Sequence, residues 1–239
     1  MSQEILMERM TWQEIESAYT ALPALKRWLV DSGIDPLVRR KPLYDDWNTW
    51  WQDQFERYSF LPPKMDRAME IGCGPYTNIR LIRKASSIRT ILCSDPLVGA
   101  YSKFKHGWLA KAFAGRSIAL IQHPGEYIPI ESASLDCVIL INVLDHVLDA
   151  EKCLLEALRT LKPDGILILG QDLTDQADMR LQENLEDIGH PIRLVQSQLD
   201  AILFKQLNPV LFRVLDREQG RAPRYHYATY IFAGIKLPD

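Results

Sequence analysis

Apolar residues in the first part of the chain recur every three or four positions, as they do on one face of a helix. We expect three helices there, and the third, from about Leu43 to Tyr58, is rich in aromatic residues. Pro62 and Pro63 interrupt this pattern, because proline is poorly tolerated inside helices and strands. The pattern therefore predicts a helical N-terminal cap over residues 1–65.

Beyond residue 65 the pattern changes to short apolar runs that alternate with amphipathic segments. We expect strands at Arg67–Gly72, Thr90–Ser94, Ser117–Ile121, Leu135–Ile141 and Gly165–Leu169. Helical stripes between them are formed by Tyr101, Phe104, Trp108 and Ala112, and by Ala150, Leu154, Ala157, Leu158 and Leu161. Strands that alternate with helices indicate a parallel sheet with right-handed crossovers.

The last third of the chain predicts one further helix and two longer strands. The helix is expected at Val195–Gln206, and the strands at Val210–Leu215 and Tyr225–Lys236. A connection containing Gly220 and Pro223 joins the two strands, so we expect an antiparallel pair. Residues 66–239 then form one α/β domain with a doubly wound, mostly parallel sheet of seven strands.

Composition and charge narrow the class of protein. A formal net charge of −3 without a run of Lys or Arg gives no reason to expect nucleic acid as a partner. No apolar run approaches the roughly 20 residues that span a bilayer, and the N-terminus is not a signal peptide, so we expect a cytoplasmic protein with no membrane contact. The cysteines lack metal-type spacing and are expected to be buried thiols: Cys73, Cys93, Cys137 and Cys153.

The sharpest motif follows the first predicted strand, where Glu70 precedes the sequence Gly72-Cys73-Gly74-Pro75. Glycines at this place let the backbone turn tightly and let a ligand approach the main chain. A dinucleotide site would have a third glycine where Thr77 stands, and the charge of Glu70 suits an amino group better than a phosphate. A plain tight turn remains the alternative.

Two further segments lie where strand ends should form the same crevice. Asp95 ends the second strand, where a carboxylate can accept hydrogen bonds from ribose hydroxyls, and Pro96 follows it as an apolar surface for a base. A helix cap is the alternative role of Asp95. A loop with Gly125 and Glu126 follows the third strand and can reach an adenine amino group.

In order and spacing, these motifs resemble the class I S-adenosylmethionine-dependent methyltransferases, over roughly Arg67 to Gln171. The resemblance rests on EIGCGP, Asp95, GEYIP, SLDCVILINVLDHV and LRTLKPDGILIL. It implies S-adenosylmethionine as methyl donor, S-adenosylhomocysteine as product, and a Rossmann-like sheet whose last strand is antiparallel. The residues that it implies for cofactor binding are Glu70, Gly72, Cys73, Gly74, Pro75, Asp95, Pro96, Gly125, Glu126, Asn142 and Val143. Pro75 and Tyr76 replace the small residues usual in the family, and Pro75 removes an amide donor.

Candidate catalytic residues follow the fourth and fifth predicted strands. His146 lies where the methyl group should sit, and Asp172 follows the neighbouring strand. Some sugar and natural-product O-methyltransferases look similar here, so our leading hypothesis is a His146–Asp172 dyad that deprotonates a hydroxyl acceptor. Helix capping and packing are the alternatives. His190, in a loop with Arg193, is the second candidate and could hold an anionic or sugar acceptor.

Aromatic residues of the third cap helix are candidates for acceptor contacts. Tyr44, Trp47 and Trp51 share a helix face, and Tyr76 could reach the same side, although packing against the sheet would explain most of the tryptophans. The spacing of Asp172, Asp175 and Asp178 invites a metal interpretation. We instead expect these three carboxylates to cap and solvate a helix start, and we expect no metal.

The sequence thus predicts an enzyme that methylates a small-molecule acceptor, most naturally a hydroxyl of a sugar or natural product. The alternatives are an N- or C-methyltransferase of a small metabolite, a catalytically silent partner subunit that binds the cofactor, and a nicotinamide oxidoreductase. A nucleic-acid methyltransferase is disfavoured, because NVLDHV stands where base-modifying enzymes carry an aromatic tetrad. A homodimer remains open.

Overall fold

The computed structural model describes residues 46–103, 107–175, 192–221, 223 and 226–238. The first two helices expected in the N-terminal cap lie outside the described residues. The third is present as α5 (Asp46–Gln54), which is followed by the 3-10 turn η1 (Glu56–Tyr58). The first strand begins at Lys64, shortly after the two prolines.

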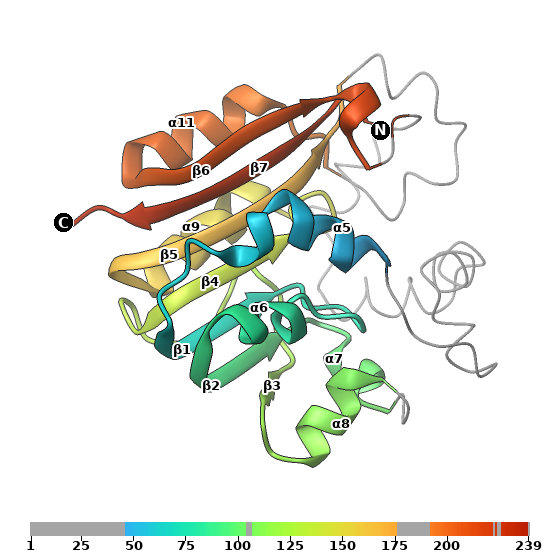
Figure 1. Ribbon diagram of the computed structural model, residues 1–239, viewed down its shortest axis with the longest axis vertical. Coiled ribbons are helices and arrows are strands. Elements are labelled where there is room, and N and C mark those ends of the chain that lie inside the picture. The colour runs from blue at the N-terminus through green and yellow to red at the C-terminus, as the bar shows by residue number, and fades with distance from the viewer. Residues whose placement is uncertain (1–45, 104–106, 176–191, 222, 224–225, 239) are drawn as a thin grey trace.

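A seven-stranded sheet forms the centre of the described structure, in the order β3-β2-β1-β4-β5-β7-β6 (Figure 1). The strands are β1 (Lys64–Ile71), β2 (Ser87–Ser94), β3 (Ala119–Ile121), β4 (Leu135–Ile141), β5 (Leu161–Leu173), β6 (Leu207–Asp216) and β7 (Ala228–Lys236). β1 to β5 pair in parallel, and β7 runs antiparallel to both β5 and β6. The predicted fold class, a mostly parallel sheet with an antiparallel last strand, is confirmed.

The helices differ from the predicted ones in one place, and the strand β5 is longer than predicted. The helices are α6 (Ile79–Ala85), α7 (Val98–Tyr101), α8 (Trp108–Ala114), α9 (Ala150–Thr160), α11 (Gln196–Gln206) and the 3-10 turn η3 (Arg217–Gln219). The stripe from Tyr101 to Ala112 belongs to two helices rather than one, because Gly107 has extended backbone angles and begins α8. β5 extends to Leu173, so Asp172 lies inside the strand and not beyond it.

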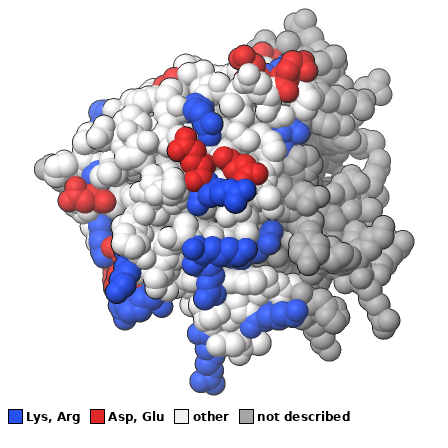
Figure 2. Space-filling model, viewed as in Figure 1, with Lys and Arg blue, Asp and Glu red and all other residues white. Residues whose placement is uncertain are grey.

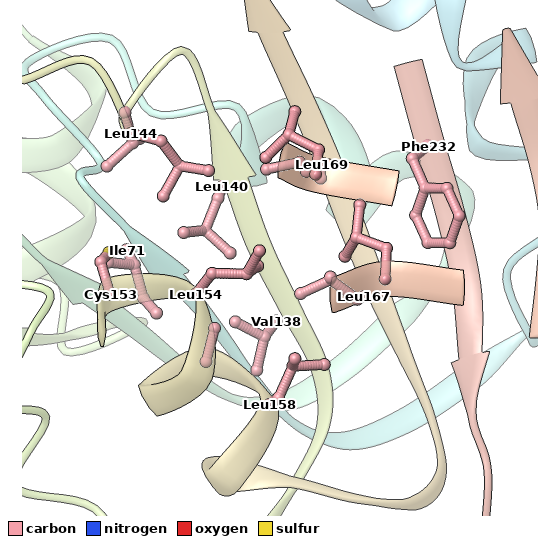
Figure 3. Packing of buried hydrophobic residues seen from close by; sticks show 14 of the residues in the cluster. Ile71, Val138, Leu140, Leu144, Cys153, Leu154, Leu158, Leu167, Leu169 and Phe232 are labelled. Atoms are coloured by element: carbon pink, nitrogen blue, oxygen red, sulfur yellow. The ribbon is translucent and has the colours of Figure 1, made fainter. Parts of the chain in front are cut away.

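Two apolar layers cover the two faces of the sheet, because alternate strand residues point to opposite sides. On one face Ala68, Cys137 and Ile139 pack with α5, α6 and α8. On the other face Val138, Leu140 and Leu167 pack with α9 and α11. Figure 3 shows Leu154 and Leu158 of α9 against this second layer. The continuous apolar sequence of β4 is thereby explained, since this strand is covered on both faces.

The carboxyl ends of the parallel strands lie at one edge of the sheet, called here the carboxyl edge. The loops after β1, β2 and β4 therefore start there, as the register of these strands requires. β7 is reversed, and its first residue, Ala228, pairs with Leu173 near the end of β5. The connection between β6 and β7 consequently lies at the carboxyl edge too. No helix within the described residues is long and apolar enough to cross a membrane.

Gly170 shows how tightly the cap helix packs on the sheet, since a Cβ atom there would lie 2.6 Å from Cζ3 of Trp51. We predict that Gly170→Ala lowers the free energy of unfolding by about 1–3 kcal/mol, the usual cost of overpacking a core. Chemical denaturation measures this change. Adding Trp51→Leu should restore part of the loss by removing the ring, and equal stability of Gly170→Ala and the wild type would contradict the packing described.

Candidate cofactor and acceptor site

The loop after β1 is closed by two glycines in the left-handed backbone region, Gly72 at φ 64° and Gly74 at φ 52°. A Cβ atom on Gly72 would lie 2.6 Å from Cγ2 of Val143, so this loop rests directly on the segment after β4. A Cβ atom on Gly74 would meet nothing within 4 Å. The loop is therefore packed against Val143 at Gly72 and has open space beside Gly74. A ligand that approaches the backbone needs such open space.

Glu70 is buried beneath this loop, and its carboxylate holds the start of α6. One oxygen accepts from the backbone N–H of Asn78 at 2.8 Å, and the other accepts from Ile79 N–H at 3.0 Å and from the Thr77 hydroxyl. Burial raises the pKa of Glu70, and these hydrogen bonds oppose the rise. The sequence prediction placed Glu70 at the cofactor but missed that Thr77 and Asn78 occupy its oxygens.

Asp95 acts on the same loop from the end of β2. Its carboxylate accepts from Gly74 N–H at 3.1 Å and from Leu97 N–H at 2.8 Å, just before α7. Burial raises the pKa of Asp95 to about 6, against the lowering effect of these two bonds. The cap-like contact considered for Asp95 is thus present. Glu70 and Asp95 converge on one loop, which is the juxtaposition that the cofactor hypothesis requires.

The loop after β3 is fixed beneath the same edge. A Cβ atom on Gly125 would lie 2.5 Å from Sγ of Cys153, so no larger residue fits there. Oε1 of the buried Glu126 accepts from the backbone N–H groups of Leu148 at 2.6 Å and Asp149 at 3.1 Å. Its Oε2 is buried without a hydrogen-bond partner among the described residues. Glu126 therefore joins the β3 loop to the start of α9.

The end of β4 has a left-handed turn at Asn142, where φ is 56°. The N–H of Asn142 donates to the Gly170 carbonyl at 2.7 Å. The next two amides, of Val143 and Leu144, both donate to Oε1 of Gln171, at 3.2 and 3.0 Å. Gln171, which the sequence prediction missed, thus fixes the backbone on which Gly72 rests.

The contacts described for Asp172, the acid of the predicted dyad, are with residues other than His146. This carboxylate is fully buried, and it accepts from Arg221 Nη2 at 2.9 Å and from the Thr229 hydroxyl at 2.9 Å. His146 is partly exposed, and its Nε2 lies 3.8 Å from Oδ1 of the adjacent Asp145. Asp172 forms an ion pair with Arg221. This pair is possible because β5 continues past its expected end, so that Asp172 lies next to the β6–β7 connection.

Arg221 and His226 are two further site residues that sequence reasoning missed. Both belong to the β6–β7 connection, whereas the sequence prediction placed Arg221 in a plain loop and His226 at the start of the last strand. Nδ1 of His226 lies 3.1 Å from the Thr174 hydroxyl, and its Nε2 lies 3.9 Å from Asp172. The signal that could have found them is the strand reversal, which returns this connection to the carboxyl edge.

The predicted acceptor residues have different environments. Trp51 is 1% exposed and packs in the core against Gly170, with Arg221 lying 5.8 Å from its ring centroid. This burial favours the packing role over an open platform. Tyr76 is half-buried, and its carbonyl accepts from the Asn48 side chain. Tyr44, His190, Asp178 and the side chain of Trp47 lie outside the described residues.

Arg193 lies close to the predicted catalytic positions. It is half-buried, and its neighbours hold the backbone there, because Ile192 N–H donates to the Asp145 carbonyl at 3.3 Å and Thr174 N–H donates to the Leu194 carbonyl at 3.0 Å. The four cysteines are buried and unbridged, as expected. Among the residues that the structure describes, no group of three or more His, Cys, Asp or Glu side chains could hold a metal ion.

The two loop glycines provide a matched pair of variants. Gly72→Ala adds a steric overlap with Val143 to the cost of a left-handed alanine, whereas Gly74→Ala adds only the backbone cost of about 1–2 kcal/mol. We predict that Gly72→Ala unfolds at distinctly lower denaturant than Gly74→Ala. If an expected ligand lies over Gly74, this second variant should lose affinity for S-adenosylhomocysteine out of proportion to its stability. Equal stability of the two variants would contradict the assigned contacts.

The chain is similar in sequence to a methyltransferase domain and to one curated protein. Residues 69–169 match the family described as a methyltransferase domain. The chain is 32% identical over 108 residues to an uncharacterized 37.1 kDa protein in transposon TN4556 of Streptomyces fradiae. That match covers 44% of this chain and 30% of the relative, so the chain spans less than a third of that protein.

Solved structures share the fold at low sequence identity. N-methyltransferase NodS from Bradyrhizobium japonicum, in complex with S-adenosylhomocysteine, has a TM-score of 0.59 at 13% identity, covering 95% of this chain and 98% of that chain. The [4+2]-cyclase SpnF has a TM-score of 0.60 at 13% identity, covering 80% of this chain and 81% of that chain. Residues 69–169 are thus similar to a methyltransferase domain, and the seven-stranded sheet is shared with these solved structures.

Proposed function

We propose that this protein transfers a methyl group from S-adenosylmethionine to a small-molecule acceptor, a hydroxyl of a sugar or natural product. The observation that carries the proposal is the loop at Gly72–Gly74, on which the carboxylate of Asp95 converges at the carboxyl edge. The partly exposed side chains of His146 and Arg221 belong to the same edge of the sheet.

The residues present fit this cofactor. Gly74 leaves open space above a left-handed turn, so an amino-acid moiety can lie against the backbone. Asp95 is half-buried next to that turn, where its carboxylate can accept from ribose hydroxyls as well as from backbone amides. Glu70 contributes indirectly, because it fixes the turn that leads into α6.

S-adenosylmethionine, when bound, would supply a methyl group on a sulfonium. The sulfur would keep the electrons of the broken C–S bond and leave as the neutral thioether of S-adenosylhomocysteine. The chain must hold an acceptor oxygen in line with that methyl, about 3 Å away, and exclude water. His146 follows β4 and has an exposed part, so it is the proposed base that takes the hydroxyl proton while the C–O bond forms. Asp145, 3.8 Å from its Nε2, would orient this ring in place of Asp172.

An N-methyltransferase is the second candidate function. NodS, which matches this chain over nearly its whole length, is named as an N-methyltransferase, and a neutral amine acceptor would need positioning but no base. C-methylation and a catalytically silent cofactor-binding subunit remain further alternatives. The fold alone does not choose among them, since SpnF carries the name of a cyclase.

A small-molecule acceptor is the partner that we propose, with no nucleic acid. Lys and Arg side chains lie over α6 and α8 on the face shown in Figure 2. Exposed Arg83 and Lys84 of α6 and Lys111 of α8 lie in this region. These residues are scattered along two helices and do not form a consecutive run.

Binding of S-adenosylhomocysteine tests the cofactor assignment, and its pH dependence tests Asp95. Because burial raises the pKa of Asp95 to about 6, the carboxylate loses its charge as the pH falls below that value. The charged form accepts from ribose hydroxyls, so affinity should rise up to about tenfold from about pH 5 to pH 7. Isothermal titration calorimetry across this range measures the change.

The matched variant is Asp95→Asn, which keeps the shape but not the charge. We expect it to bind S-adenosylhomocysteine more weakly, with no pH dependence near pH 6. Absence of binding by the wild type at every pH would overturn the cofactor assignment. Binding that follows the same pH curve in the variant would leave the cofactor in place but exclude Asp95 as the titrating group.

His146→Ala tests whether the acceptor is a hydroxyl. With methyl-labelled cofactor and a panel of hydroxyl and amine acceptors, we expect the variant to methylate hydroxyl acceptors about 10² times more slowly than the wild type. Its affinity for S-adenosylhomocysteine should stay unchanged. Transfer to amines alone, at equal rates in both proteins, would exclude the hydroxyl proposal and favour the N-methyltransferase.

A further inference from the structure

A buried ionic cluster joins the end of β5 to the β6–β7 connection. Its centre is Asp172, whose side chain is completely inaccessible to solvent. Arg221 Nη2 donates to one carboxylate oxygen and the Thr229 hydroxyl donates to the other, both at 2.9 Å. A buried carboxylate must be paired in this way, because an unpaired charge in the interior is strongly unfavourable.

Asn142 at the end of β4 is part of the same cluster. With its amide oriented to suit both neighbours, its nitrogen donates to Asp172 Oδ2 at 3.2 Å and its oxygen accepts from Arg221 Nη2 at 3.1 Å. The opposite orientation would place oxygen against carboxylate and nitrogen against guanidinium. One guanidinium nitrogen of Arg221 therefore contacts both Asp172 and Asn142.

These contacts bear on the cofactor loop through one residue. Asn142 has a left-handed backbone, which asparagine adopts more readily than other residues with a side chain, and its contacts with Asp172 and Arg221 help to hold this turn. The following residue, Val143, supports Gly72, where a Cβ atom would come within 2.6 Å of its side chain. A change in the turn at Asn142 would therefore move the surface on which the Gly72–Gly74 loop rests.

We propose that Arg221 is a positioning residue that couples the acceptor side of the site to cofactor binding. Through Asp172 and Asn142 it holds the turn after β4, and this turn supports the loop that receives the cofactor. The inference rests on the proposed function, and it assigns a role in that site to the β6–β7 connection. Arg221 acts without touching the cofactor.

Trp51 of α5 lies on another side of Arg221, with its ring centroid 5.8 Å from the guanidinium carbon. The guanidinium is thereby held between the cap helix and the carboxylate of Asp172.

The test is calorimetric titration of the full chain with S-adenosylhomocysteine. We expect Arg221→Gln to weaken binding about tenfold, a usual size for coupling between sites. Arg221→Lys should bind nearly as well as the wild type, because one ammonium can take the place of the single bridging nitrogen. The matched control is Arg217→Gln in the same connection, whose guanidinium donates to the Pro223 carbonyl and should leave affinity unchanged.

A double-mutant cycle separates positioning from general loss of stability. Asn142→Gly removes the side-chain link at a φ that glycine adopts freely, and it should weaken binding to a similar degree. If Arg221 acts through Asn142, Arg221→Gln should have no further effect in the Asn142→Gly background. Thermal denaturation of each variant verifies that folded protein is compared.

The outcomes distinguish this inference from the proposed function. No binding by the wild type overturns both. Wild-type affinity in folded Arg221→Gln, or full additivity in the cycle, overturns the positioning role and leaves the proposed function intact. If Arg221→Gln does not fold, Asn142→Gly decides, since unchanged affinity in that variant overturns the link to the cofactor loop.

Discussion

The parallel direction of β1, β2, β4 and β5 is the constraint from which the rest of the site follows. Strands that pair in parallel end at one edge, so their exposed backbone groups and the loops after them must be accommodated together. The chain turns sharply at this edge after β1, at Gly72–Gly74, and after β4, at Asn142. Each turn contains left-handed backbone. They fit because Gly72 has no side chain where Val143 lies.

Acidic side chains at this edge accept hydrogen bonds from the protein's own backbone N–H groups. Both carboxylate oxygens of Glu70 accept hydrogen bonds from the start of α6, and Glu126 accepts from two backbone N–H groups before α9. Asp172 pairs with Arg221, and Asp95 is half-buried with one of its two partners, Gly74, on the open loop. A carboxylate in a cleft is therefore not by itself a ligand contact, and its hydrogen bonds decide which task it performs.

The surroundings of Asp172 are assembled from segments far apart in the chain. Trp51 comes from the cap helix, Asp172 from β5 and Arg221 from the β6–β7 connection. Because the β7 strand is reversed, a connection that would otherwise lie at the opposite edge reaches the end of β5. Contacts of this kind depend on the path of the whole chain and not on any single motif.

Local pattern determined much of this protein: the strand periodicity, the glycine turn, the strand-end Asp95 and the reversed final strand are all visible in the sequence. They depend on backbone geometry and on neighbours a few residues away. The partners of buried charges were decided only by tertiary structure. The sequence suggested His146 for Asp172, whereas β5 runs four residues past its predicted end, to Leu173, and the return of the β6–β7 connection brings Arg221 to Asp172. A buried charge pairs with an opposite charge that the fold brings close to it. The distance in space between two such residues cannot be deduced from their separation along the sequence.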